Sequence, residues 1–345
     1  MSIEIKGKEM TIPVVQGGMG IGISTGKLAG AVAAEGGMGT LSFVNCGYEE
    51  EDFYQNPIEA NKRAFEKNLK KAKEISQGKG ILMVNIMHVV NHFFEYLEFI
   101  NTTEIDGVVV GAGLPLELPQ YIGEDKRIAP IVSSGRALKI ILRKWKKKYN
   151  RVPDFVVLEG PKAGGHLGFK KEDLSMDLFQ ELEEIKKILR EYGEESIPVF
   201  IGGGFGTKEG FQTAMEKGAD GVQIGTGFLF TKESGLDPVA KECLVESLRK
   251  GKIEDQIIQS PVGLLGRALN TEFVRKVEEE KVPAKHCVAC ISTCNPKTTP
   301  YCINEALIRG VKGNQEEGLF FSGSDGRRIK EILSVKDYLK EILGE

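Results

Sequence analysis

The chain has 345 residues, of which 41% are hydrophobic and 28% are charged, so it can bury the core of one large domain. Its formal net charge of -3 excludes the strongly basic balance that is typical of nucleic-acid-binding proteins. The sequence contains no run close to the roughly 18 apolar residues of a membrane span. It also does not begin with a basic and then apolar leader, so we expect a cytoplasmic protein without membrane contact.

Short apolar runs alternate with amphipathic stretches along the first 240 residues or so. The runs predict strands over residues 13–16, 38–43, 81–86, 107–110, 129–132, 154–158, 198–201 and 221–224. The stretches between them predict helices that include residues 25–35, 58–76, 135–147, 174–192 and 207–217. The strands lack polar alternation, which indicates burial on both faces of a parallel sheet. This pattern predicts an α/β protein with a (β/α)8 TIM barrel.

The rest of the chain is longer than a barrel needs. We expect residues 1–250 to form the barrel and residues 251–345 to form a mostly helical C-terminal extension that packs over its mouth. Residues 260–268 predict a loop over the substrate pocket, and residues 318–324 are expected to return to the rim of the barrel. Residues 329–343 predict a terminal amphipathic helix.

Glycine-rich and polar segments directly follow the predicted strands. Because the carboxyl ends of barrel strands form the active-site face, we expect the residues there to meet around one pocket. The glycines after the seventh and eighth strands predict a phosphate site, since free backbone N–H groups can face an anion there. A histidine among these residues suits proton transfer near neutral pH. The candidates are Gln16, Gly17, Gly18, Met19, Asn85, Ser133, Glu159, Gly164, Gly165, His166, Gly202, Gly203, Gly204, Gly225 and Thr226.

The segment Glu159-Gly-Pro-Lys-Ala-Gly-Gly-His166-Leu-Gly168 resembles a motif of the FMN-dependent nitronate monooxygenases, also called 2-nitropropane dioxygenases. The flavin-type enoyl-acyl-carrier-protein reductases are similar in fold, and the resemblance covers roughly residues 8–330. It implies FMN as the cofactor and His166 as the catalytic proton-transfer residue. It also implies that the other candidates, from Gln16 to Thr226, form the flavin site. Glu159 stands where nitronate monooxygenases often have Gln and the reductases have Glu.

The resemblance leaves three functions open. The first is oxidation of alkyl nitronates with O2, and the second is NAD(P)H-dependent reduction of an enoyl thioester. The third is a flavin-binding protein without catalytic turnover. The first two imply a small-molecule substrate as the partner, and a homodimer is one candidate assembly.

Cysteines and further histidines raise the alternative of a metal centre. Thiolates spaced as in Cys287, Cys290, Cys294 and Cys302 can converge on zinc or an iron–sulfur cluster, but the spacing matches no specific ligand pattern. In the family that this chain resembles, the residues around these cysteines favour reduced structural thiols. His88 and His92 could share a helix face, although no third ligand stands near them. We therefore expect no metal.

Overall fold

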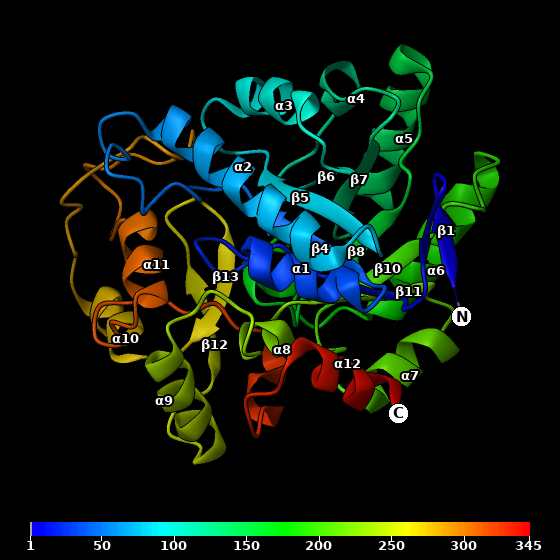
Figure 1. Ribbon diagram of the computed structural model, residues 1–345. Helices are drawn as coiled ribbons and strands as arrows, with labels where there is room; N and C mark the ends of the chain where they lie inside the picture. The colour runs from blue at the N-terminus through cyan, green and yellow to red at the C-terminus, as the bar shows by residue number, and fades with distance from the viewer. Residues whose placement is uncertain (1) are drawn as a thin grey trace.

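The computed structural model describes residues 2–345, and its centre is a closed barrel of eight parallel strands (Figure 1). The barrel closes where Val222 of the last strand pairs with Val14 of the first. All eight strands overlap the predicted ones, so the predicted fold class is confirmed. The strands are β3 (Val14–Gln16), β4 (Met38–Ser42), β5 (Ile81–Met87), β6 (Gly107–Gly111), β7 (Arg127–Val132), β8 (Val156–Glu159), β10 (Val199–Gly202) and β11 (Gly221–Ile224).

Amphipathic helices surround the barrel. In the helix of residues 135–149, Leu138, Ile141, Leu142 and Trp145 face inward at helical spacing, and the Ser134 hydroxyl caps its first turn. The predicted helix 174–192 begins only at Leu178, because Asp177 accepts a hydrogen bond from the N–H of Phe179. The helices are α1 (Gly26–Ala34), α2 (Pro57–Ser76), α3 (Phe93–Thr102), α4 (Leu118–Tyr121), α5 (Gly135–Tyr149), η1 (Lys171–Asp173), α6 (Leu178–Glu191), α7 (Lys208–Glu216), α8 (Thr226–Leu229) and α9 (Pro238–Arg249).

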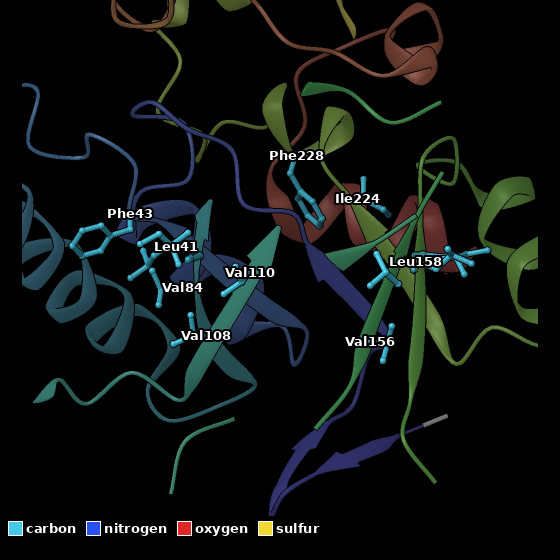
Figure 2. Packing of buried hydrophobic residues seen from close by; sticks show 14 of the residues in the cluster. Leu41, Phe43, Val84, Val108, Val110, Val156, Leu158, Ile224 and Phe228 are labelled. Carbon is cyan, nitrogen blue, oxygen red and sulfur yellow. The ribbon is translucent and has the colours of Figure 1, made fainter. Parts of the chain in front are cut away.

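The barrel strands bury apolar side chains on both faces. Leu41, Val84 and Val110 belong to the cluster between the strands and the outer helices (Figure 2). Alternate residues such as Val109 and Phe200 fill the barrel interior. A hairpin that the sequence analysis did not predict, β1 (Ile3–Ile5) with β2 (Lys8–Met10), adds Ile5 and Met10 to this interior cluster.

The C-terminal extension contains a β-hairpin as well as helices. Strands β12 (Asp255–Gln259) and β13 (Leu265–Leu269) pair with each other, and β13 also pairs with β9 (Gly165–Leu167) from the segment after β8. Residues 265–268 were predicted as loop, and that prediction is wrong because β9 offers them a free strand edge. The helices of the extension are α10 (Glu272–Glu279), α11 (Ile303–Val311), η2 (Ser324–Arg328) and α12 (Val335–Leu343).

The terminal helix is shorter than predicted. It begins at Val335 instead of residue 329, because the hydroxyl of Ser334 accepts a hydrogen bond from the N–H of Asp337 and caps the first turn. The division of the chain at residue 250 stays a prediction. Between residues 2 and 345, no helix is long and apolar enough to cross a membrane.

Candidate active site at the carboxyl end of the barrel

A cavity of about 230 Å³ opens among the segments that follow the barrel strands. Its walls come from the ends of the strands and from the C-terminal extension. The structure therefore brings most of the predicted site residues around one space. Those that line it are Gly17, Gly18, Met19, Asn85, Glu159, Gly164, Gly165, His166, Gly202, Gly203, Gly204, Gly225 and Thr226.

Gln16 and Ser133 are the two candidates that do not line this cavity. Gln16 is fully buried behind it, where its Nε2 donates to Ser24 Oγ at 2.8 Å and its Oε1 accepts the N–H of Thr40 at 2.9 Å. Ser133 donates its hydroxyl to the carbonyl of Gly168 at 3.0 Å. Both side chains thus bond neighbouring segments of the barrel, and their roles in the site stay predictions.

The loop after β3 packs closely against β5. A Cβ on Gly18 would stand 2.3 Å from Cβ of Asn85, so only glycine allows this approach. The Nδ2 of Asn85 donates to the carbonyl of Val109 at 3.4 Å. Its Oδ1 bonds no described residue and is left to accept a hydrogen bond from a ligand.

The glycines after β10 and β11 form a cradle of donors. Gly203 and Gly204 have φ values of +99° and +98°, and successive backbone N–H groups in such turns point toward one concave side. The N–H groups of Gly204, Gly225 and Thr226 donate to no acceptor in the described part of the chain. Lys162 lines the same space, and its Cδ would lie 3.4 Å from a Cβ on Gly204. This donor set, with its nearby ammonium, fits a phosphate group.

His166 enters the cavity from β9. Its Nε2 is 2.8 Å from the hydroxyl of Ser260, and its ring meets that of Phe321 edge-on at 5.1 Å between centroids. Burial lowers the pKa of His166 to about 4, so the imidazole is neutral near pH 7. A Cβ on Gly164 would stand 2.5 Å from the nitrogen of Gly323, which explains why glycine precedes this strand.

Glu159 lies at the end of β8 and also faces the cavity. Burial raises the pKa of its carboxyl to about 7, because a charged carboxylate loses hydration there. Two titratable side chains whose pKa values move in opposite directions thus share one cavity. That arrangement is typical of sites that bind charge or transfer protons.

Comparisons with known proteins agree with this geometry. A family model described as nitronate monooxygenase matches residues 3–345. The chain belongs to the nitronate monooxygenase family. That family consists of flavin-dependent oxidoreductases, so the chain is an enzyme of this class.

Individual relatives span nearly the whole chain. A probable nitronate monooxygenase of Bacillus subtilis (strain 168) is 22% identical, with 97% of this chain and 96% of the relative covered. The structure of FabK from Thermotoga maritima is 26% identical with a TM-score of 0.68, covering 97% of this chain and 92% of FabK. A nitroalkane oxidase from Streptomyces ansochromogenes has the same fold, with a TM-score of 0.71, 19% identity and coverage of 97% and 96%.

Some cavity residues were predicted from the sequence and others were not. Residues 318–324 were expected to return to the barrel rim, and they do, since Phe320, Phe321 and Gly323 line the cavity. Lys162 was missed although it stands inside the diagnostic motif. Gln223, Leu307 and Asp325 also line the cavity, but no motif in the sequence marks them.

The cysteines and remaining histidines lie apart from the cavity lining. All six cysteines are free thiols. In the part of the chain that the structure describes, no three His, Cys, Asp or Glu side chains converge as metal ligands. His88 packs edge-on against Phe93, whereas His92 is exposed and lies 3.3 Å from Glu95.

Proposed function

We propose that this enzyme is an FMN-dependent nitronate monooxygenase that oxidises alkyl nitronates with O2. One observation carries the proposal. A single cavity joins a cradle of unpaired backbone N–H groups to a neutral histidine and to an amide oxygen that is free to accept a hydrogen bond. The family model supports the reaction class.

The residues present fit FMN. Gly204, Gly225 and Thr226 would hold its phosphate through their N–H groups, with Lys162 supplying a positive charge. The loop of Gly17, Gly18 and Met19, together with Asn85, would line its ring system. When bound, FMN supplies the acceptor for the electrons that leave the substrate.

His166 has two roles open to it in this proposal. As a neutral imidazole it donates a hydrogen bond to a nitro oxygen of the nitronate, or it accepts the α proton of a neutral nitroalkane. Phe321 of the extension packs against the histidine ring and Phe320 lines the same cavity, so the extension would limit access of water to the substrate.

A second candidate is reduction of an enoyl thioester with NAD(P)H. The similarity to FabK, an enoyl-acyl-carrier-protein reductase, favours it, as does the carboxyl group at Glu159. A carboxyl with a pKa of about 7 could give a proton to the substrate.

Anaerobic stopped-flow spectroscopy separates these candidates. We expect propyl-2-nitronate to reduce the flavin, seen as a loss of its absorbance, at least as fast as kcat. NADH or NADPH should reduce it only slowly. Rapid reduction by NAD(P)H together with turnover of an enoyl thioester would assign the second function. A flavin that neither compound reduces would assign a flavin-binding protein without turnover.

The assembly and the location of the enzyme belong to the same proposal. We expect a homodimer in the cytoplasm with a small-molecule substrate as its partner. Sedimentation velocity of the purified protein measures the assembly, and a mass near 38 kDa would contradict it.

A further inference from the structure

Ser260 occupies the turn between β12 and β13, behind the histidine. Its side chain is buried and does not line the cavity, so it cannot attack a substrate. The turn is closed by backbone hydrogen bonds from Ser260 N–H to Leu264 at 2.9 Å and from Gly263 N–H to Ser260 at 3.0 Å. These bonds place the hydroxyl independently of any ligand.

The hairpin that carries Ser260 pairs with β9, the strand that carries His166. Gly266 of β13 lies opposite His166 in the antiparallel ladder. The next residue, Arg267, pairs with Asp255 at 2.5 Å and donates to the carbonyl of Pro161 at 2.9 Å. Both side chains of this pair are largely buried, so the ion pair is little screened by solvent. The contact of Ser260 with His166 is therefore built into the fold.

Hydrogen-bond counting assigns the direction of this contact. The Ser260 oxygen already accepts the N–H of Val262 at 3.4 Å. Its hydroxyl proton has no acceptor among residues 2–345 other than Nε2 of His166 at 2.8 Å. Satisfying this buried hydroxyl proton requires Nε2 to accept it, which makes Nε2 the unprotonated nitrogen of a neutral imidazole and leaves the proton on Nδ1. No hydrogen bond of Nδ1 is found among residues 2–345, and His166 lines the cavity.

We propose that Ser260 is a positioning residue, which holds His166 as the Nδ1–H tautomer and so makes it a hydrogen-bond donor toward the substrate. Given the proposed function, the acceptor is a nitro oxygen of the nitronate. With Nε2 occupied and Nδ1 protonated, the histidine has no free basic nitrogen for the α proton of a nitroalkane. The enzyme should therefore prefer the preformed nitronate anion over the neutral nitroalkane.

Nitrogen NMR of the flavin-loaded protein tests the tautomer directly. The protein is labelled with ¹⁵N-histidine, and His166→Asn identifies the His166 signals among those of the four histidines. We expect wild-type His166 at pH 7 to show a protonated Nδ1 and an unprotonated Nε2. In Ser260→Ala both signals should move toward the average of the two tautomers, and Ser260→Thr should restore them. Unchanged signals in Ser260→Ala, or a protonated Nε2 in the wild type, would overturn the proposal.

A matched control separates positioning from general damage to the turn. Thr293 donates its hydroxyl to the carbonyl of Val262 at 2.9 Å and thus anchors the same turn without touching His166. Thr293→Ala should leave the His166 signals unchanged. An equal shift in Thr293→Ala and Ser260→Ala would mean that the turn, and not the hydroxyl, sets the tautomer.

Kinetics provide a second readout that depends on the proposed function. Ser260→Ala should lower kcat/KM for the nitronate about two- to tenfold, the scale of one net hydrogen bond, without loss of flavin. An unaltered kcat/KM in a variant whose tautomer has shifted would remove the catalytic part of the proposal. If the wild type oxidises no nitronate, the proposed function fails, and the NMR comparison still decides the role of Ser260.

Discussion

Replacing Gly225 with alanine tests the phosphate cradle without straining the backbone. Gly225 has a φ of -105°, which any residue adopts, and a Cβ there would meet only Met19, at 3.7 Å from Sδ and 4.0 Å from Cγ. The protein therefore accommodates alanine, and the unfolded chain loses some conformational entropy. We expect the flavin-free protein to be unchanged or about 0.4–1 kcal/mol more stable.

Gly225 lines the cavity beside the N–H groups that we assign to the phosphate, so under that assignment the same methyl group would crowd the phosphate. Loss of one N–H hydrogen bond to a charged group costs about 1.5–3 kcal/mol, which corresponds to roughly 10- to 150-fold weaker FMN binding. Fluorescence titration of the flavin-free protein measures the affinity, and thermal unfolding measures stability. Gly168→Ala is the control, since Gly168 lies outside the cavity lining and a Cβ there would meet only Ser133, at 3.2 Å from its Oγ. Full FMN affinity in Gly225→Ala would refute the phosphate assignment.

Three further predictions concern the histidine, the carboxyl and the thiols. His166→Asn should keep FMN bound and lower kcat/KM about 10²-fold. His92→Asn, at an exposed histidine, should leave kcat/KM unchanged. Undiminished turnover by His166→Asn would remove His166 from the mechanism. The pKa of Glu159 is raised to about 7, so ionisation of this carboxyl costs stability as pH rises toward and through 7. Glu159→Gln should therefore raise the melting temperature of the flavin-free protein more at pH 8 than at pH 5, and equal changes at both would contradict the raised pKa. Elemental analysis of anaerobically purified protein should find no stoichiometric metal, and about four irons per chain would instead assign a cluster to Cys287, Cys290, Cys294 and Cys302.

The barrel could be predicted from the sequence because its signals are local. A strand buried on both faces needs an uninterrupted apolar run, as in residues 155–158, and each run here is bounded by glycine or polar residues. Since all carboxyl ends of a parallel barrel share one face, placing the strands also placed the residues that follow them. For this reason Asn85, His166 and Thr226, although far apart in the chain, were expected around one pocket, and they line it.

The partners of individual side chains were decided only by the tertiary structure. Gln16 ends β3 next to Gly17, yet its side chain bonds Ser24 and Thr40 behind the cavity, because one position along a strand end reverses the direction of a side chain. Ser133 follows β7, but its hydroxyl bonds the carbonyl of Gly168.

Contacts over long sequence separations escaped prediction for a related reason. The strand from Leu265 to Leu269 forms on the edge offered by β9, and Ser260 reaches His166 across 94 residues. Periodicity reports whether a segment has a buried face, but it does not report which distant segment covers that face. The sequence alone thus determined the barrel and the face that bears the site, whereas long-range packing determined that Ser260 lies against Nε2 of His166.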